Sequence, residues 1–531
     1  MTTRNQAHSP PAAPSYRRGD TAVPLPAETI GDALRAAAAA APERAGVVEG
    51  APGPGPRRQL TFAELLDRST RVAGALQTRF RLGERVALWA ANSLDWIVFA
   101  HAAALAGVVL VPVNPAYRAA ELAYVLRQSR SVGLVHAATP GAAAVVAAMR
   151  ANLPDLREVH GLDAVAAAAG PQRAPREVSP AADAQIHYTS GTTAAPKGVQ
   201  LRHAALVADA RLAWDRLGGR AGDVAVWATP LFLPVACGLG MLGALSAGAT
   251  FVFPTVVDPA LHLELLDTFR ATIAFAPPVL LAALLDEAGR SGRDLRALRL
   301  FGTGGSAVPS GLVEQGERRL GVPLSAVFAA AECSPVVTAT RPDDTPHVRT
   351  TTAGSALPHT EVLIADPATG QPVPLGTVGE LRVRGYQVMR GYVDDADATA
   401  AVIDADGWYH TRDLAAMDDA GNIRLEGRLT DVIVRGGERI SPREIEDVLA
   451  THPAVAEVAV VGRPDERWGE TVAAFVRPAP GTAPTEVELH TWCRRTLAGY
   501  KTPLRWLFVD AMPVTAAGTV RRNVLRARLR M

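Results

Sequence analysis

The stretch from Tyr188 to Val199, YTSGTTAAPKGV, gathers the residue types that hold phosphate groups. Its hydroxyl side chains precede Lys197, and glycines stand at positions 191 and 198. Hydroxyl donors, one cation and a small flexible backbone together favour binding of an anion such as a polyphosphate. The phosphate loop of the common ATPases is a different pattern, because it needs glycine directly before the lysine and serine or threonine after it. Pro196 and Gly198 occupy those places. A polar surface turn is the alternative interpretation.

The composition limits the class of protein. At 531 residues the chain is too long for one hydrophobic core, so at least two domains are expected. Lys plus Arg number 54 against 53 for Asp plus Glu, and this balance gives no field that attracts nucleic acid. Three cysteines without metal-ligand spacing indicate a reducing compartment and no zinc site, so we predict a cytoplasmic protein.

No membrane span is expected, because the most apolar run contains His101, Gly107 and Pro112. The polar, proline-rich start of the chain has no apolar segment of the kind found in secretory signals, and residues 1–25 are predicted to be a disordered tail. The expected partner is a small molecule.

Helical and strand patterns alternate between about Ile30 and Arg130. LTFAELLDRSTRVAGALQTRF is amphipathic, with Thr61 in position to cap the helix and Phe62, Leu65, Val72 and Leu76 on one stripe. ERVALWAAN and VVLVPVNP read as buried strands separated by a helix, which predicts parallel strands with crossover connections. The phosphate-binding stretch is expected between a strand and a helix at 202–216. ALRLFGTGGSAVP predicts a strand ending in a glycine-rich turn, a usual place for ligands in open α/β sheets.

The pattern changes twice in the second half of the chain. From Thr360 onward, short strands and turns predict a small β subdomain. A new unit of strand, glycine turn, helix and strand starts near Leu429 and Thr430. We therefore predict an α/β fold with a large N-terminal domain of layered sheets over residues 26–428, and a small mobile α+β domain over 429–531.

Seven segments in this order resemble those of the adenylate-forming superfamily, which comprises acyl-CoA synthetases, peptide-synthetase adenylation domains and luciferases. The resemblance covers about residues 30–530. The segments are YTSGTTAAPKGV at 188–199, GTGGSAVP at 302–309, FAAAE at 328–332, GWYHTRD at 407–413, GR at 427–428, RGGERISPREIE at 435–446 and MPVTAAGTVRR at 512–522.

The resemblance implies a nucleotide site. Thr189, Ser190, Thr192, Thr193 and Lys197 match the loop that holds ATP phosphates, and Gly304, Gly305 and Ser306 match the turn that packs on adenine. Asp413 matches the carboxylate that holds the ribose hydroxyls, and Arg428 the arginine that reaches the nucleotide. Glu332 matches the glutamate that binds magnesium.

The resemblance also implies that the C-terminal domain rotates about a hinge at Thr430, serving adenylation with one face and thioester formation with the other. The loop with Gly436, Gly437 and Glu438 matches the one that enters the site in the second pose and lines the channel for CoA. Glycine suits such close backbone approach to a thin ligand.

Four positions depart from the family pattern. Thr519 stands where the family has its catalytic lysine in the last segment, and Ala331 stands where a threonine contacts the α-phosphate. Ala194 replaces a glycine of the phosphate loop, and Arg412 replaces the glycine before Asp413. Losing one contact to the transition state costs on the order of a hundred- to a thousandfold in rate. The departures weaken pyrophosphate chemistry while the contacts to AMP and to the thiol remain.

Three functions are compatible with this pattern. The favoured one is a ligase that performs only the thioester half-reaction on an acyl-AMP supplied by a separate adenylating enzyme, like the non-adenylating ligases of natural-product biosynthesis such as that of platensimycin. The second is a complete synthetase that uses ATP, with magnesium at Glu332 and another cation in place of the lysine. The third is a non-catalytic protein that binds adenylates.

The expected acyl pocket is apolar and lacks an aspartate for an α-amino group, which argues against amino acids. Its apolar and rather small residues suit a bulky hydrophobic acid, aliphatic or polycyclic, better than acetate. The residues that match the pocket of the family are Phe232, Leu233, Pro234, Cys237, Gly238, Pro278, Val279, Gly302 and Gly304.

Overall fold

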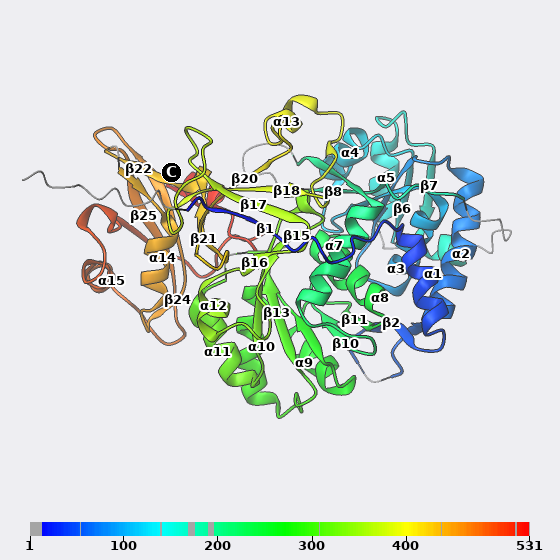
Figure 1. Ribbon diagram of the computed structural model, residues 1–531, viewed down its shortest axis with the longest axis horizontal. Coiled ribbons are helices and arrows are strands. Elements are labelled where there is room, and N and C mark those ends of the chain that lie inside the picture. The colour runs from blue at the N-terminus through cyan, green and yellow to red at the C-terminus, as the bar shows by residue number, and fades with distance from the viewer. Residues whose placement is uncertain are drawn as a thin grey trace, which may run out of the picture.

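The computed structural model describes residues 13–53, 55–137, 141–167, 176–189, 196–306, 308–436, 438–515 and 518–529. A large N-terminal part carries three sheets, and a smaller C-terminal part, orange and red in Figure 1, lies against one end of it. The predicted fold class is confirmed. The exact limit between the parts, at residues 428 and 429, stays a prediction.

The first sheet has seven strands in the order β19-β9-β8-β5-β4-β6-β7. Strands β8, β5, β4, β6 and β7 are parallel, as predicted, whereas β9 and β19 are antiparallel to their neighbours. The strands are β4 (Arg85–Trp89), β5 (Val109–Val113), β6 (Gly133–His136), β7 (Glu158–Gly161), β8 (Asp183–Tyr188), β9 (Gly198–Arg202) and β19 (Gly391–Tyr392).

The second sheet has nine strands in the order β16-β15-β14-β13-β12-β10-β11-β2-β3. Its parallel centre includes the predicted strand that ends in the glycine-rich turn, β13. The strands are β2 (Ala45–Gly50), β3 (Gln59–Thr61), β10 (Val224–Trp227), β11 (Thr250–Pro254), β12 (Ile273–Phe275), β13 (Leu300–Gly304), β14 (Leu324–Ala329), β15 (Val336–Ala339) and β16 (Ser355–Ala356).

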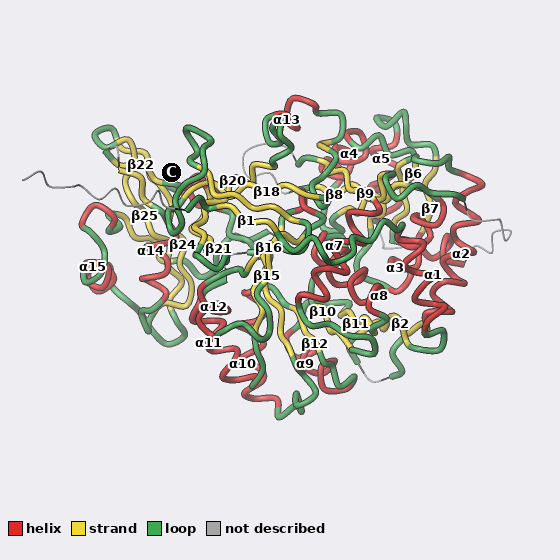
Figure 2. The backbone as a smooth tube through the Cα atoms, viewed as in Figure 1, coloured by secondary structure: helices red, strands yellow, loops and turns green. Residues whose placement is uncertain are grey.

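The third sheet is the predicted β subdomain, with the order β1-β17-β18-β20-β21. In Figure 2 its yellow strands run between the C-terminal part and the helical region that holds α3, α7 and α8. The strands are β1 (Tyr16–Arg18), β17 (Thr360–Ala365), β18 (Gly379–Gly385), β20 (Tyr409–Met417) and β21 (Ile423–Arg428).

The predicted disordered tail over residues 1–25 is wrong for β1. Tyr16 to Arg18 pair antiparallel with Leu363 to Glu361 of β17, and the Tyr16 hydroxyl donates to Glu361 at 2.6 Å. An edge strand is held by backbone hydrogen bonds, so a segment with little apolar pattern can still join a sheet.

The helices of the N-terminal part cover its sheets. The predicted amphipathic helix is α2, where Thr61 and Glu64 form a capping box and Phe62, Leu65, Val72 and Leu76 are all buried. Each such side chain contributes about 1.5–3 kcal/mol of burial energy. The helices are α1 (Ile30–Ala40), α2 (Phe62–Arg79), α3 (Leu94–Ala106), α4 (Ala119–Gln128), α5 (Ala142–Arg150), α6 (Leu162–Ala167), α7 (His203–Arg216), the π-helix η1 (Val235–Leu242), α8 (Gly243–Ala247), α9 (Pro259–Thr268), α10 (Pro278–Ser291), α11 (Ser310–Leu320), the 3₁₀ turn η2 (Ala331–Cys333), α12 (Pro346–Thr351) and α13 (Ala396–Ala400).

The C-terminal part is one sheet of order β23-β22-β25-β24, with β26 on β25, and it has helices beside it. A short strand, β23, stands between the predicted glycine turn and helix α14. Its elements are η3 (Leu429–Asp431), β22 (Ile433–Arg435), β23 (Glu438–Ile440), α14 (Pro442–Ala450), β24 (Val455–Asp465), β25 (Gly469–Pro478), α15 (Glu486–Arg494), η4 (Gly499–Lys501), β26 (Arg505–Phe508) and α16 (Arg522–Arg528).

Two further features bear on the predictions from sequence. Within the described ranges, no helix combines the length and the apolar character that crossing a membrane requires. Cys237, Cys333 and Cys493 are all unpaired and buried.

Candidate active site

Asp413 and Arg428 face each other on neighbouring strands of the β subdomain. They are register partners on β20 and β21, and Arg428 Nε lies 3.1 Å from Asp413 Oδ1. Burial raises the pKa of Asp413 to about 6, and the charge of Arg428 opposes that rise. At neutral pH the carboxyl group is therefore mostly ionised, and a buried carboxylate beside an arginine can accept hydrogen bonds from two ligand hydroxyls.

In the turn after β13, the backbone of a glycine without a side chain is exposed at the surface. A Cβ on Gly304 would lie 2.4 Å from the carbonyl oxygen of Val327, so the close approach of β14 requires glycine there. Gly305 has φ +84°, in the left-handed region that favours glycine, and it is exposed. Ser306 follows it and is half-buried. A flat ligand such as an adenine ring can pack on this turn.

Glu332 and Ala331 lie together in η2, which follows β14. The Glu332 carboxylate accepts a hydrogen bond at 2.9 Å from the hydroxyl of Tyr392, a residue of the edge strand β19. Lys197 Nζ lies 4.8 Å from the centre of the Tyr392 ring. Tyr392 therefore joins the lysine of the phosphate-binding stretch to Glu332.

Sequence reasoning missed Tyr392. The only local signal was the Gly391–Tyr392 pair between two turns, and a two-residue strand has no period to detect.

The phosphate-binding stretch closes a hairpin. The strands before and after it, β8 and β9, pair antiparallel. Next to their last pair, Thr189 N donates to Lys197 O at 3.1 Å. The predicted helix at 202–216 is confirmed as α7 (His203–Arg216), and β9, which was not predicted, lies between the phosphate-binding stretch and this helix. Ser190, Gly191, Thr192, Thr193 and Ala194 lie outside the described residues.

Tyr188 is not one of the hydroxyls available to a phosphate. Its hydroxyl donates to the Gln128 side chain on α4, and burial raises the pKa of Tyr188. The alternation of side chains along β8 turns this one toward α4.

The loop at 512–515 and 518–522, here called the C-terminal loop, reaches the N-terminal part. Thr519 Oγ1 lies 3.4 Å from the carbonyl oxygen of Gly305, and a Cβ on Gly518 would lie 3.8 Å from Val279. Thr519 thus stands beside the turn that follows β13, and its side chain carries no charge.

Two basic side chains near that loop are held elsewhere. Arg522 donates to Glu446 at 2.9 Å and lies 3.3 Å from Asp431. Lys501 Nζ lies 2.6 Å from Glu444. Both are bound within the C-terminal part, so neither side chain takes the place of a lysine at 519.

The glycine loop after β22 lies away from this site. Gly436 has φ +59°, and a Cβ on it would lie 2.9 Å from the ring of Trp468. Glu438 is exposed and pairs with Arg435 across the hairpin, and Gly437 lies outside the described residues. In Figure 1, β22 lies at the far end of the C-terminal part from β13. The structure therefore brings together Thr519 and Gly305 but not the predicted thiol-side loop.

Thr430 lies in η3, directly between β21 and β22. It is exposed, and its carbonyl oxygen accepts a hydrogen bond from Arg526 at 3.4 Å. The two parts also touch through Arg443, which donates to Val308 O at 3.1 Å, and Ser441, which donates to Glu426 O at 2.8 Å. These few polar contacts flank a short connection that could serve as a hinge.

The predicted acyl-pocket residues come from three neighbouring elements. Phe232, Leu233 and Pro234 are half-buried before η1, whereas Cys237 and Gly238 are buried within it. The Gln185 amide donates to Cys237 Sγ at 3.3 Å, and burial raises the pKa of that thiol to about 12. Pi-helical segments occur often at functional sites.

The other wall is formed by the start of α10 and the end of β13. Val279 is 51% exposed and faces the C-terminal loop, while Pro278 beneath it is buried. Gly302 is buried against Phe275, and Gly304 follows two residues later on β13. The residues predicted to form the acyl pocket thus lie at and before the start of η1, at the start of α10 and on β13, and their contact with an acyl group stays a prediction.

Glu332 has the donor chemistry for magnesium. Among the described residues there is no group of three or more His, Cys, Asp or Glu side chains placed to hold a metal ion. Mg²⁺ is, however, commonly held by one or two carboxylates together with substrate phosphates, so a single glutamate beside a phosphate site fits it. A bound magnesium ion would supply charge neutralisation to those phosphates.

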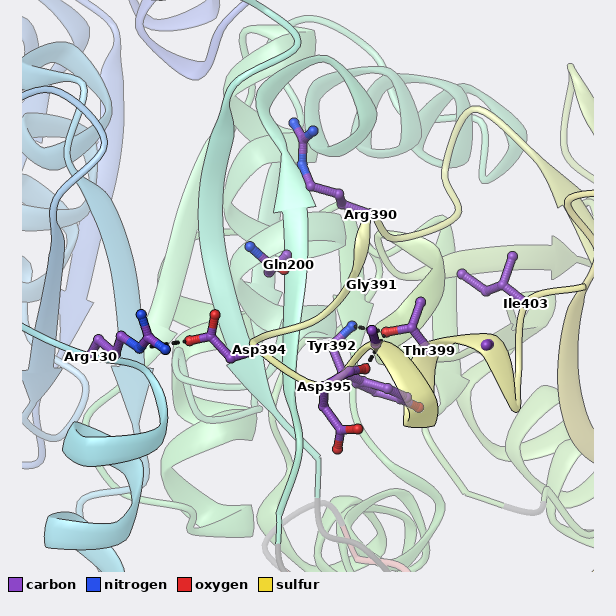
Figure 3. A pocket seen from close by; sticks show the side chains of 11 residues that line it. Arg130, Gln200, Arg390, Gly391, Tyr392, Asp394, Asp395, Thr399 and Ile403 are labelled. Carbon is purple, nitrogen blue, oxygen red and sulfur yellow. Dashed lines mark hydrogen bonds and ion pairs between the residues drawn. The ribbon is translucent and has the colours of Figure 1, made fainter.

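A cavity of about 700 Å³ lies on the outer side of β9 and β19 (Figure 3). Arg130 Nε pairs with Asp394 at 3.0 Å, and Arg390 with Asp183 at 2.8 Å, so both cations of its lining are neutralised. Tyr392 also borders this cavity, where its backbone N–H donates to Thr399 Oγ1 at 2.9 Å. Tyr392 is therefore hydrogen-bonded both to Thr399 at this cavity and to Glu332.

Two family models match the sequence of this chain. The model of the AMP-binding enzyme family matches residues 34–393, and that of the AMP-binding enzyme C-terminal domain matches residues 444–519. The chain belongs to the AMP-binding enzyme family.

Similar proteins cover nearly the whole chain. It is 37% identical over 497 residues to the 3-[(3aS,4S,7aS)-7a-methyl-1,5-dioxo-octahydro-1H-inden-4-yl]propanoyl:CoA ligase of Mycobacterium tuberculosis, covering 88% of this chain and 94% of that protein. It is 32% identical over 566 residues to the mitochondrial medium-chain acyl-CoA ligase ACSF2 of Rattus norvegicus, covering 97% and 90%. The crystal structure of the anthranilate CoA ligase AuaEII with anthranoyl-AMP has a TM-score of 0.87 at 25% identity, covering 96% and 98% of the two chains.

Proposed function

We propose that the protein is an acyl-CoA ligase whose main activity is the thioester half-reaction. An acyl-AMP and CoA give an acyl-CoA and AMP. The CoA sulfur forms a bond to the acyl carbonyl carbon, the bond between that carbon and the phosphate oxygen breaks, and the thiol proton passes to solvent. The acyl group is already activated, so the protein mainly has to position the thiol and accept the charge of AMP.

The observation that carries the proposal is the uncharged Thr519 at 3.4 Å from Gly305 O. In the family that the sequence resembles, a lysine at this point joins the acid to the nucleotide during adenylation. Here Arg522 and Lys501 are bound to glutamates of the C-terminal part. Without a lysine at 519, adenylation loses one charged contact to its transition state, which costs on the order of a hundred- to a thousandfold in rate.

The N-terminal part keeps what an adenylate needs. We assign the ribose to Asp413 with Arg428 beside it, the adenine to the turn of Gly304, Gly305 and Ser306, and the phosphate to Thr189, Lys197 and the hydroxyls of the intervening stretch. Gly436 and Glu438 would reach the thiol only after the C-terminal part turns about Thr430, because their hairpin now lies on Trp468.

The substrate we propose is a bulky hydrophobic acyl group. The residues that we assign to the acyl pocket on η1, α10 and β13 are apolar or glycine, and Val279 is exposed beside Gly518 of the C-terminal loop, which supports this choice. The relative from Mycobacterium tuberculosis acts, by its name, on a bicyclic propanoyl acid, which supports a polycyclic substrate.

The proposal implies a partner enzyme and a cellular compartment. A separate adenylating enzyme would supply the acyl-AMP, as in the non-adenylating ligases of natural-product pathways that the sequence resembles. Three free, buried cysteines support a reducing compartment, for which we propose the cytoplasm.

A complete ATP-dependent synthetase is the second candidate. Lys197 and Glu332, which would hold the phosphates and magnesium, lie together around Tyr392 and favour it. A non-catalytic adenylate-binding protein is the third.

One pair of reactions distinguishes these functions. The purified protein is given a synthetic polycyclic or long-chain acyl-AMP with CoA, and separately the free acid with ATP, magnesium and CoA, and the thioester is quantified by chromatography. The proposal expects rapid thioester formation only in the first mixture. Equal turnover in both mixtures would establish the complete synthetase, and no thioester in either would favour the non-catalytic protein.

A further inference from the structure

Arg412 occupies a backbone conformation that arginine rarely adopts. Its φ is +60°, which only five other non-glycine residues of the described ranges share in sign. A left-handed conformation is unfavourable for an L-residue with a side chain, because its Cβ approaches the following carbonyl oxygen too closely. The conformation persists because Arg412 lies in a β-bulge, where Thr411, Arg412 and Asp413 of β20 oppose the single residue Leu381 of β18. Bulges beside functional sites redirect side chains, and this one precedes Asp413 directly.

The side chain of Arg412 is exposed and unpaired. Within the described part of the chain, no hydrogen bond or ion pair holds its guanidinium, whereas Arg428 on the adjacent strand is engaged by Asp413. Burial raises the pKa of Tyr392, and the charge of Arg412 opposes that rise. The guanidinium therefore acts on the same tyrosine that contacts Lys197 and Glu332.

Arg412 and Thr519 lie in different parts of the chain. Arg412 is on β20 of the N-terminal part and keeps its place next to Asp413 whatever the C-terminal part does. Thr519 is on the C-terminal loop, which touches the site through one long hydrogen bond to Gly305. A cation on β20 would remain beside a nucleotide phosphate throughout thioester formation, when AMP leaves and its phosphate gains negative charge.

We propose that Arg412 binds the phosphate of the adenylate and of AMP, and that it supplies from the N-terminal part the positive charge that the C-terminal loop lacks at Thr519. This inference rests on the proposed nucleotide site and deepens it. A charge-assisted contact to phosphate shortens and strengthens the hydrogen bond relative to a neutral one. The strained backbone of Arg412 then has a functional reason, because it directs a cation into the site.

Binding of AMP and of adenosine tests the proposal without any turnover. Arg412→Gly removes the charge and relieves the strained conformation, so the variant should fold at least as stably as the parent. We expect the dissociation constant of AMP, measured by calorimetry, to rise about tenfold in this variant, a loss typical of one charged hydrogen bond. The dissociation constant of adenosine, which has no phosphate, should change less than about twofold by the same argument.

Two further variants sharpen the result. Arg412→Lys keeps the charge and should retain most of the affinity for AMP. Arg505→Gln removes one charge from an exposed strand of the C-terminal part and should leave both ligands unaffected. An unchanged dissociation constant for AMP in Arg412→Gly would overturn the proposal, as would an equal loss for AMP and adenosine, which would make Arg412 a support for Asp413 only.

These outcomes are independent of the proposed reaction. A protein that formed no thioester but discriminated AMP from adenosine through Arg412 would refute the half-reaction and leave the phosphate contact intact. Thioester formation with no role for Arg412 in binding would do the reverse.

Discussion

The two sides of the site differ in what they offer to a phosphate. On the N-terminal side, Lys197, Arg412 and Arg428 bring three positive charges near Glu332 and Asp413. On the C-terminal side, the C-terminal loop places the uncharged Thr519 beside Gly305, and Arg522 of the same loop is bound to Glu446. The proposed function assigns binding of an adenylate to the first side and the loss of adenylation to the second, so the two activities are expected to be separable.

On the N-terminal side, we expect the largest loss of activity from a substitution of Asp413. Asp413→Ala removes the carboxylate that pairs with Arg428 and two potential hydrogen bonds to ribose, so we expect thioester formation from acyl-AMP to fall about a hundred- to a thousandfold. The rate is measured with saturating CoA. Asp419→Ala, an exposed aspartate in the turn after β20, is the control and should behave like the parent. A loss below about threefold would remove Asp413 from the proposed nucleotide site.

On the C-terminal side, a positive charge can be restored at position 519. Thr519→Lys should increase thioester formation from acid, ATP and CoA by about a hundredfold, because it returns a cation to the adenylation transition state. Formation from acyl-AMP should stay the same. Thr491→Lys adds the same charge on α15, away from the site, and should have no effect. No gain from Thr519→Lys, alone or with Ala331→Thr, would place the deficit elsewhere, for instance at Ala194.

The charge of the N-terminal side should depend on pH through Asp413. Its pKa of about 6 means that the carboxylate is ionised above pH 6 and protonated below it. A protonated carboxyl accepts fewer hydrogen bonds, so the affinity for adenosine should fall about tenfold between pH 7 and pH 5. Adenosine is used because the phosphate of AMP titrates in the same range. Asp413→Asn should give a flat profile, and a flat profile in the parent would contradict this role.

The smallest expected effect is at Tyr392. Tyr392→Phe removes the hydrogen bond to Glu332 and keeps the ring beneath Lys197, so the rate of thioester formation should fall about two- to tenfold. Tyr16→Phe, which loses a hydroxyl contact to Glu361 on the far strand of the β subdomain, serves as the control. Identical rates in both variants would show that Tyr392 only fills space.

The sequence predicted the fold class and most elements of the N-terminal part, because long periodic patterns such as 60–80 are decided locally by capping and burial. It could not predict β1 or β9. β1 depends on pairing with β17 more than three hundred residues away, and β9 turns the phosphate-binding stretch into a hairpin.

The motifs named Asp413 and Arg428, and the structure pairs these residues on adjacent strands, while their contacts to a nucleotide stay a prediction. The contacts of a residue could not be predicted where they depend on side chains that lie close only in the folded protein. Tyr392 lies in a two-residue strand, and Tyr188 is drawn away from the phosphate-binding stretch by Gln128. The one signal for the positive φ of Arg412 was the glycine that the family has at this position, and the bulge against β18 that produces this conformation could not be predicted.

The exchange of labelled pyrophosphate into ATP, driven by the free acid and measured beside single-turnover thioester formation from acyl-AMP, tests the central claim most directly. Exchange reports adenylation alone, and the second reaction reports thioester formation alone. The account expects exchange at least a hundredfold slower than thioester formation in the same preparation, a ratio on the order of one lost charged contact. Exchange as fast as thioester formation would contradict it, because the C-terminal side would then not need the cation that Thr519 lacks.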